Sequence, residues 1–351
     1  MMCGRLSKAR CKSRRRHLGV WARLLNRASD RQAVRGNARS EVKRQLEFSW
    51  GDGMKSWAGL ASRALRSLGF ACFMVLTFAT AAGPASAKAA AAPKPSSPRL
   101  YVLDCGTISP MDPALFSLKA NEVKGDVSFV SPCFLVVHPK GTLIWDVGQV
   151  PDKDIPDDGT EVVQQGILKA KHRLATQLAA LGFQPKDITY MAMSHYHADH
   201  TANANLFAKS TWIVQQAEYD AMFNTAKVGI RSPETYSDLK DAKRIVLNNE
   251  DHDVFGDGTV IIKTAPGHTP GHQMLFLRLK HTGPLLLAGD LYHLPEERAL
   301  DRVPTFDFDA AMTRSTRKKV EEFVRQTGAT EWIQHDPPTY ARAKKAPEFY
   351  D

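Results

Sequence analysis

Apolar residues beyond about residue 98 fall into short runs whose spacing alternates between that of strands and that of helices. Runs rich in Val, Ile, Leu and Phe, bounded by Gly or Pro, predict strands at 100–104, 128–138, 142–146 and 188–193. In 166–181 apolar residues recur every three or four positions, which predicts a helix that ends at Gly182. Strand-like and helix-like runs then alternate at 212–214, 217–223, 260–264, 274–279, 285–288, 310–325 and 332–334. This alternation indicates an α/β fold whose sheets are covered by helices.

The charge of the chain is concentrated at its start. Residues 1–87 carry 17 Lys or Arg against 4 Asp or Glu, whereas the whole chain has a formal net charge of +10. The remaining residues therefore have no excess of positive charge that would favour nucleic acid or an acidic membrane, and we expect no nucleic-acid partner. We interpret residues 1–53 as a basic extension that is either disordered or the product of a start assigned too early, with Met54 as the true start.

Residues 54–87 have the three parts of a secretory signal peptide. A basic beginning with Lys55, Arg63 and Arg66 precedes an apolar run at 68–82, and Ala-Ser-Ala at 85–87 provides a cleavage pattern. The run is shorter than the roughly 20 residues that a membrane-spanning helix needs. We therefore expect a periplasmic or secreted protein without stable membrane insertion, with an uncleaved anchor as the alternative.

Residues 88–98 are rich in Ala, Pro and Ser and predict a linker, so that one folded domain is expected over 99–351. Of the five cysteines, Cys105 and Cys133 lie in this domain. Export would place both in a compartment where disulfides form. The two thiols either pair or stay free and buried, and their spacing does not distinguish these outcomes.

The strongest chemical signal is Ser-His-Tyr-His-Ala-Asp-His at 194–200, directly after a predicted strand. Alternate side chains of an extended segment point to the same side, so His195 and His197 project together. If the chain then turns into a helix, Asp199 and His200 face a neighbouring point. Imidazole and carboxylate groups suit Zn²⁺ and also bind iron, manganese or cobalt. The loop therefore predicts a metal site that serves up to two ions.

The pattern His-x-His-x-Asp-His after a buried strand resembles the signature of the metallo-β-lactamase superfamily. Three further motifs follow in that family's order: Thr-Ala-Pro-Gly-His-Thr-Pro-Gly-His at 264–272, Ala-Gly-Asp at 288–290 and Gln-His-Asp at 334–336. The resemblance spans about residues 99–340. It implies an αβ/βα four-layer sandwich with the metal site at its edge.

The resemblance also implies a two-metal site, with Zn²⁺ as the expected ion. Its ligands would be His195, His197 and His268 for one metal, Asp199, His200 and His335 for the other, and Asp290 as a bridge. Hydroxide held between two cations would attack a polarised carbonyl, so that no Ser or Cys nucleophile is needed. Asp199 is predicted to carry a proton to the leaving oxygen. His272 is expected to support its loop rather than bind metal.

Differences among the branches of the superfamily favour a lactonase that opens N-acyl homoserine lactones or related cyclic esters. Zinc β-lactamases typically lack the bridge that Asp290 supplies. Glyoxalase II enzymes carry a helical region after the final histidine, whereas only 16 residues follow His335 here. Lactonases of this branch use a tyrosine three residues after the bridging aspartate, where this chain has His293 with Tyr292 beside it. Either is predicted to hydrogen-bond the developing oxyanion, or both merely pack beside the site.

Two segments allow two interpretations each. Apolar residues in 111–134 either line a pocket for an acyl chain or belong to the core. The connection 295–309 either covers the site or is a surface excursion. For the whole protein, the alternatives to a lactonase are another hydrolase (β-lactamase-like, thioesterase or phosphodiesterase) and a non-catalytic metal-binding protein.

Overall fold

The computed structural model of the chain describes residues 95–225 and 230–351. The predicted basic extension and signal peptide lie outside the described residues. One sheet has eight strands in the order β4-β5-β1-β2-β3-β6-β7-β8. In that order the strands are Val162–Gln164, Leu168–Ala170, Arg99–Met111, Val127–His138, Gly141–Trp145, Tyr190–Ala192, Thr211–Gln215 and Arg244–Leu247.

The second sheet has five strands in the order β13-β12-β11-β10-β9. In that order they are Thr330–Trp332, Gly283–Leu287, Gln273–Leu279, Val260–Thr264 and His252–Asp253. The α-helices are α2 (Leu174–Ala180), α3 (Ala198–Thr201), α4 (Gln216–Phe223), α5 (Pro295–Ala299), α6 (Ala310–Thr327) and α7 (Pro337–Arg342). No helix in the described ranges combines the length and the apolar composition that crossing a membrane requires.

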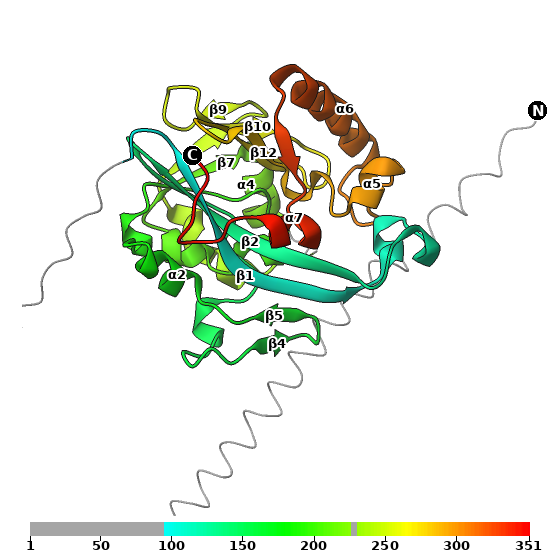
Figure 1. Cartoon of the computed structure of the whole chain (residues 1–351), viewed down its shortest axis with the longest axis horizontal. Helices are drawn as coiled ribbons and strands as arrows, with labels where there is room; N and C mark the ends of the chain where they lie inside the picture. The colour runs from blue at the N-terminus through cyan, green and yellow to red at the C-terminus, as the bar shows by residue number, and fades with distance from the viewer. Residues whose placement is uncertain (1–94, 226–229) are drawn as a thin grey trace, which may run out of the picture. The chain divides into compact units, whose positions relative to one another are not determined.

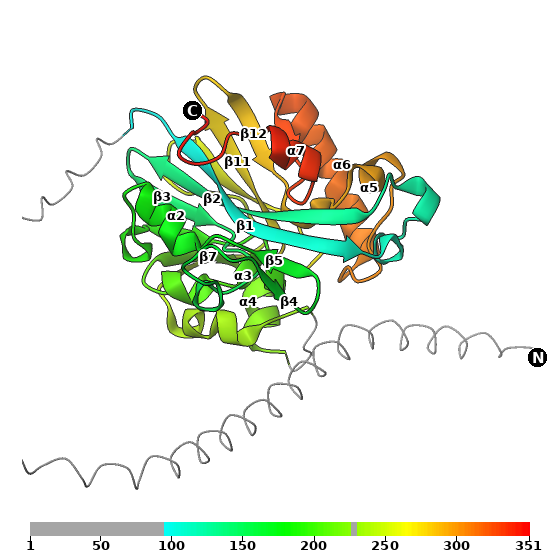
Figure 2. The same cartoon turned by 60° about the horizontal axis from the view of Figure 1, so that its bottom comes forward.

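The two sheets pack face to face with helices on their outer faces (Figures 1 and 2). Side chains alternate across β1, so Val102 enters the core between the sheets while Leu103 packs with Leu174 and Leu178 of α2. On the other side, Phe276 of β11 and Leu286 of β12 pack against α6. These layers, helix on sheet on sheet on helix, confirm the predicted αβ/βα sandwich.

Strand direction brings the ends of several strands to one edge of the sandwich. Strands β3, β6, β7 and β8 run parallel, so their carboxyl ends meet at the same side. Asp146 follows β3, and the segment 194–200 follows β6. The pairing of β3 with β6 therefore sets these two segments beside each other.

The helix predicted over 166–181 is wrong in its first half. Residues Leu168–Ala170 form β5, which pairs with β1 through Thr107 and Ile108, and the helix begins only at Leu174. Apolar spacing over so few residues fits a short edge hairpin as well as a helix, and pairing with β1 decides between them. The end of the helix at Leu181, before Gly182 with its positive φ of 85°, is as predicted.

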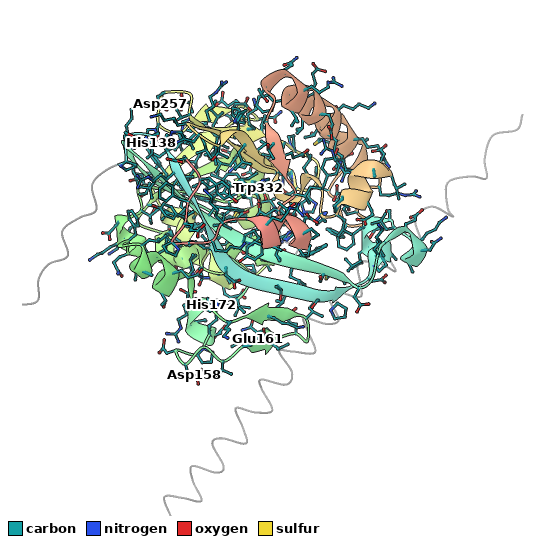
Figure 3. The ribbon with its side chains drawn as sticks, viewed as in Figure 1. His138, Asp158, Glu161, His172, Asp257 and Trp332 are labelled. Carbon is teal, nitrogen blue, oxygen red and sulfur yellow. A yellow bond between two sulfur atoms is a disulfide. The ribbon has the colours of Figure 1, made fainter. Side chains whose placement is uncertain are left out.

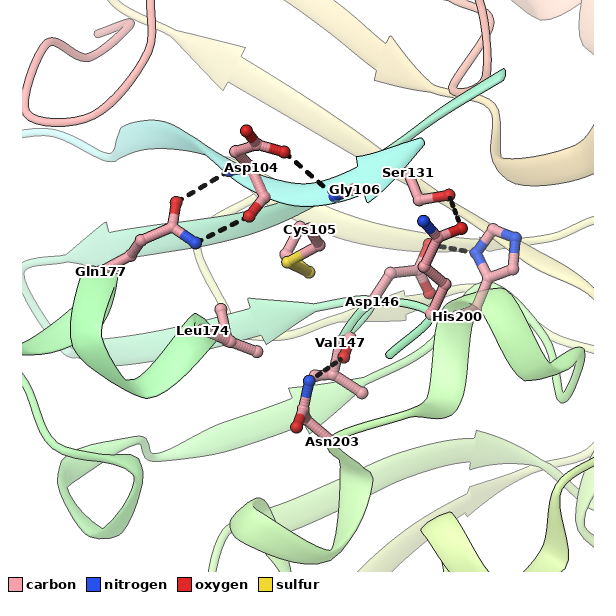
Figure 4. The surroundings of a disulfide bond; sticks show 12 residues. Asp104, Cys105, Gly106, Ser131, Asp146, Val147, Leu174, Gln177, His200 and Asn203 are labelled. Atoms are coloured by element: carbon pink, nitrogen blue, oxygen red, sulfur yellow. Dashed lines mark hydrogen bonds and ion pairs between the residues drawn. A yellow bond between two sulfur atoms is a disulfide. The ribbon is translucent and has the colours of Figure 1, made fainter. Parts of the chain in front are cut away.

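Cys105 of β1 and Cys133 of β2 form a disulfide, with Cα atoms 5.8 Å apart (Figure 4). Leu103 and Cys133 are paired residues in the antiparallel register, which brings the neighbouring Cys105 within reach. Of the two outcomes that the sequence left open, the structure therefore has the paired one.

Candidate metal centre

Histidines and aspartates from four segments meet at the edge of the sandwich in two groups. In each group the possible ligand atoms lie within 4.8 Å of one another. The first group contains His195, His197, His268 and Asp290, and the second contains Asp199, His200 and His335. All seven residues that the motifs singled out are thus brought together, and apart from Asp199 all of them are buried.

Local structure after β6 explains how one short loop serves both groups. Asp146 accepts hydrogen bonds from the backbone N–H of Ser194 (2.6 Å) and from its hydroxyl (3.0 Å), which fixes the start of the loop. His197 stays extended, with φ −63° and ψ 152°, and is the last residue before the short helix α3. Because the chain turns into that helix, His200 points to the second group rather than the first.

The loop between β10 and β11 delivers His268. Within this loop His272 takes part in neither group. Its Nδ1 lies 3.0 Å from the carbonyl oxygen of Ala265, and its Nε2 accepts a hydrogen bond from the backbone N–H of Asp290 at 3.0 Å. His272 therefore supports the two segments that carry His268 and Asp290, as its place in the motif predicted.

Asp290 lies between the two groups, and each of its oxygens faces one of them. Oδ2 is 3.5 Å from Nε2 of His195 and 3.4 Å from Nε2 of His268. Oδ1 is 3.3 Å from Nε2 of His200 and 3.0 Å from Nε2 of His335. A carboxylate in this position can place one oxygen on each of two ions.

The spacing of the donor atoms fits bound cations. Nε2 of His268 is 3.2 Å from Nε2 of His195 and 3.0 Å from Nδ1 of His197, and Nε2 of His335 is 3.2 Å from Nε2 of His200. Ligand nitrogens about 2.0–2.1 Å from a tetrahedral Zn²⁺ lie roughly 3.3 Å apart. Oδ1 of Asp290 is also buried without a hydrogen bond among the described residues, which suits a metal ligand.

The nitrogens that face away from the groups are held by hydrogen bonds. Nδ1 of His200 lies 3.0 Å from Asp146, Nδ1 of His195 lies 3.0 Å from the hydroxyl of Ser194, and Nδ1 of His335 lies 2.7 Å from a backbone carbonyl oxygen. Such partners fix the orientation of a ligating imidazole. Asp146 lies outside the sequence motifs, although an acidic residue directly after a buried strand is a usable signal for it.

The pKa values of the histidines differ between the two groups. Burial, together with neighbouring imidazoles, lowers the pKa of His195, His197 and His268 well below the usual histidine value, so these rings are neutral as metal ligands must be. Burial also disfavours the charged form of His200, but the carboxylates of Asp290, Asp199 and Asp146 outweigh it and raise its pKa well above that value. The negative charge beside the second group therefore attracts a cation, whether a proton or a metal.

Tyr292 and His293 point in opposite directions, and the prediction of a site role for Tyr292 is wrong. Tyr292 is extended, with φ −138° and ψ 142°, so consecutive side chains face opposite sides. Its hydroxyl donates to Glu321 at 3.1 Å, and its ring packs against Arg317 of α6. His293 faces the site, with Nε2 3.1 Å from Oδ2 of Asp290 and Nδ1 3.3 Å from Glu297. Its predicted contact with a substrate stays a prediction.

Aromatic side chains from two segments border the groups. Phe129 stacks on His335 with ring centroids 5.0 Å apart, and Phe116 lies 5.1 Å from the ring of His293. Phe306 lies 5.8 Å from His268 and 6.3 Å from His197. The apolar residues of 111–134 are therefore core residues that also adjoin the site, and the connection 295–309 reaches the site through Phe306.

Histidines outside the motifs have ordinary structural partners. His138 is buried, stacks on Phe255 and lies 3.0 Å from Asp257 (Figure 3). His172 is half exposed and lies 3.9 Å from Asp104. Neither belongs to a metal-binding group among the described residues.

Comparison with known sequences places these motifs in context. The sequence profile of the Metallo-beta-lactamase superfamily matches residues 128–328. N-acyl homoserine lactonase AttM of Rhizobium radiobacter is 34% identical over 263 residues, which cover 72% of this chain and 98% of that protein. N-acyl homoserine lactonase AiiA of Bacillus thuringiensis subsp. kurstaki is 28% identical over 228 residues, which cover 62% of this chain and 85% of the relative.

Solved structures show the same fold. An N-acyl homoserine lactone hydrolase with the product N-hexanoyl-L-homoserine bound at its catalytic metal center superposes with a TM-score of 0.60 at 24% identity, over 72% of this chain and 98% of the other. AidC, a dizinc quorum-quenching lactonase, superposes with a TM-score of 0.51 at 20% identity, over 72% and 94% of the two chains.

Proposed function

The chain belongs to the metallo-β-lactamase superfamily, and from this membership we propose that it is a metal-dependent lactonase that opens N-acyl homoserine lactones or related cyclic esters. The observation that carries the proposal is the position of Asp290, with one oxygen toward each of two complete ligand groups. Relatives that align over 98% of their own length and are named N-acyl homoserine lactonases support the choice of substrate.

The donor set favours Zn²⁺, because five imidazoles and two carboxylates provide the nitrogen and oxygen ligands that zinc binds. His195, His197 and His268 would hold one ion, Asp199, His200 and His335 would hold the other, and Asp290 would contact both. A bound pair of divalent cations supplies activated water and polarises a carbonyl group.

Asp199 is the member of the site that is suited to proton transfer. Its side chain is 17% exposed, whereas the histidines beside it are almost completely buried. Its Oδ2 lies 3.5 Å from Nε2 of both His200 and His335, so it is held at the open side of the second group. A carboxylate in that place can accept a proton from the attacking water and donate it to the alkoxide that leaves when the lactone ring opens.

Apolar side chains support an acyl group as part of the substrate. Phe116 and Phe129 lie beside His293 and His335, and Phe306 lies beside His268. Phe116 and Phe129 are buried behind the site, whereas Phe306 is partly exposed, so Phe306 is the side chain among the three that a hydrocarbon tail next to the reactive ester would contact.

We further propose that the protein is exported, to the periplasm or outside the cell. The signal-peptide pattern at 54–87 and the Cys105–Cys133 disulfide support this location, because disulfides persist in oxidising compartments. The N-terminus of the protein recovered from cells is expected at Lys88, and recovery of uncleaved protein from the cytoplasm would contradict export.

Metal analysis and hydrolysis assays on one sample test the proposed function. We expect two equivalents of metal per chain, with zinc as the native ion, and ring opening of N-acyl homoserine lactones as followed by acid release. Asp199→Asn should lower the rate by at least about 100-fold, since a general acid–base group contributes roughly 10²–10⁴-fold.

The same sample should be given a chromogenic β-lactam, a thioester and a phosphodiester. Faster turnover of any of these than of lactones would assign a different hydrolase reaction to the site. Metal-loaded protein without lactone turnover above the Asp199→Asn variant would end the proposal.

A further inference from the structure

We propose that Asp307 is a positioning residue for His268, which it holds with Nδ1–H toward itself and with the Nε2 lone pair toward the first metal group. Asp307 lies in the connection after α5, outside the motifs of the ligand loops. The inference rests on the proposed function in one respect, since it presumes that the first group binds a metal ion.

The contact between the two side chains is short and excluded from water. Nδ1 of His268 lies 2.8 Å from Oδ1 of Asp307, and each side chain is only 1% exposed. A carboxylate accepts hydrogen bonds, so Nδ1 must carry the proton in this pair. The ring is then left with an unprotonated Nε2, and that atom faces His195 and His197. Asp307 thereby selects the tautomer that a metal ligand needs.

Asp307 is itself fixed in place. Its Oδ2 accepts a hydrogen bond of 2.6 Å from the hydroxyl of Thr313, in the first turn of α6. The backbone around it is tied to the His268 loop, because the N–H of Phe308 donates to the carbonyl of His268 and the N–H of Asp309 donates to the carbonyl of Gly267, both at 3.0 Å. The backbone hydrogen bonds hold the segment that carries Asp307 beside the His268 loop, and the Thr313 hydroxyl restrains the orientation of the carboxylate itself.

The role is specific to one ion. In the first group, the hydroxyl of Ser194 is the one hydrogen-bond partner of Nδ1 of His195 among residues 95–225 and 230–351, and His197 uses its own Nδ1 toward His268. Within the part of the chain that the structure describes, His268 is the histidine of that group that is paired with a carboxylate outside the site. In the second group Asp146 plays the comparable part for His200. A carboxylate behind an imidazole raises its basicity, and the loss of such a partner typically costs 10–100-fold in metal affinity. Removal of the Asp307 carboxylate should therefore lower the affinity for one of the two metal ions.

The test is a titration of the metal-free full-length protein with Zn²⁺ in competition with a chromophoric chelator. For Asp307→Asn we expect one equivalent to bind 10–100-fold more weakly while the other is unchanged. Asp301→Asn is the matched control, because Asp301 lies in the same connection but is 72% exposed and pairs with Arg314 at the surface. This control should bind both equivalents like the unmodified protein.

Thr313→Val provides a second variant that keeps His268 and Asp307 and removes only the hydroxyl that fixes the carboxylate. Thr313→Val should lower the affinity for the same Zn²⁺ ion by a smaller factor. If Asp307→Asn does not fold, this variant alone tests the inference. Imidazole ¹H–¹⁵N spectra add a readout that a merely structural role would not move. The hydrogen-bonded Nδ1–H signal of His268 should be present in the unmodified protein and shifted in Asp307→Asn.

Two results would overturn the inference. One is that Asp307→Asn and Thr313→Val both retain the two affinities of the Asp301→Asn control. The other is that both equivalents weaken alike, which would indicate a general loss of structure. If the unmodified protein itself binds no metal, the proposed function fails instead, so the two failures are distinguishable.

Discussion

At the scale of single residues, burial controls the ionisation of two carboxyl groups that are not among the proposed metal ligands. Burial raises the pKa of Glu331 from 4.5 to about 7, although Arg298, 3.1 Å away, opposes the shift. Burial raises the pKa of Glu218 to a similar value. Glu218 accepts hydrogen bonds from the backbone N–H of Tyr196 and Gly271 and thus joins the two histidine loops.

Glu331 offers a direct test of this effect. A raised pKa in the folded state means that the native protein binds the proton more tightly than the unfolded chain does, so the group's contribution to stability is present below about pH 4.5 and is lost as the pH rises toward 7. Over this pH range, the free energy of unfolding should fall by up to about 3 kcal/mol less in Glu331→Gln than in the unmodified protein.

Urea unfolding at several pH values between 4.5 and 7.5 measures the decline. Glu161→Gln, at an exposed position of the β4–β5 hairpin region (Figure 3), is the control and should keep the slope of the unmodified protein. Identical slopes for Glu331→Gln and the unmodified protein would show that Glu331 titrates alike in the folded and unfolded chain, so that burial does not raise its pKa.

At the scale of elements, the His268 loop depends on its close approach to α6. A Cβ on Gly267 would lie 2.5 Å from the backbone nitrogen of Thr313 and 2.6 Å from its Cα, and the φ of Gly267 is +142°. Both the clash and the backbone conformation exclude a side chain there. The glycine is therefore what allows this loop to lie against the start of the helix.

Gly267→Ala should lower the free energy of unfolding by about 2–4 kcal/mol, because strain and overpacking each cost a few kcal/mol. It should also weaken metal binding, since the loop that carries His268 must shift. Gly258→Ala is a suitable comparison, because Gly258 has a positive φ of +76° but open space around it. Chemical unfolding and metal titration of both variants give the measurement, and equal effects of the two would argue against the packing explanation.

At the scale of the whole molecule, the disulfide cross-links β1 and β2 beside a segment that leads to the metal centre. A Cβ at Gly148 would lie 3.0 Å from Cβ of Cys105, so the disulfide packs directly against the segment that begins with Asp146 (Figure 4). Asp146 in turn holds His200. The covalent link therefore packs against the segment whose Asp146 positions a ligand of the second metal group.

Replacing both cysteines, by Cys105→Ser with Cys133→Ser, should lower the free energy of unfolding by about 3–4 kcal/mol. This figure follows from the chain entropy that a link across a sequence separation of 28 removes from the unfolded state. Thermal unfolding with and without a reductant checks it. The reductant should lower the Tm of the unmodified protein and leave the double variant unchanged, whereas no response in either would mean that the thiols are free.

The sequence by itself determined the fold class and assembled all seven residues that the structure brings together at the metal centre. Strand alternation accounts for His195 and His197 projecting together, whereas the sandwich fold and the ligand roles of the other residues followed from the resemblance of four ordered motifs to the metallo-β-lactamase superfamily. The comparisons with known proteins support the lactonase branch that those motifs indicated.

The tertiary structure decided the features that depend on which distant segments come to lie side by side. Pairing of β1 with β5 made a strand of residues predicted as helix, and the β1–β2 register joined Cys105 to Cys133. Packing against α6 turned Tyr292 away from the site and brought Asp307 behind His268. No spacing in the sequence encodes these contacts, because they form between segments that only the folded chain brings together. Polar groups that are buried there must then find their partners on the neighbouring segment.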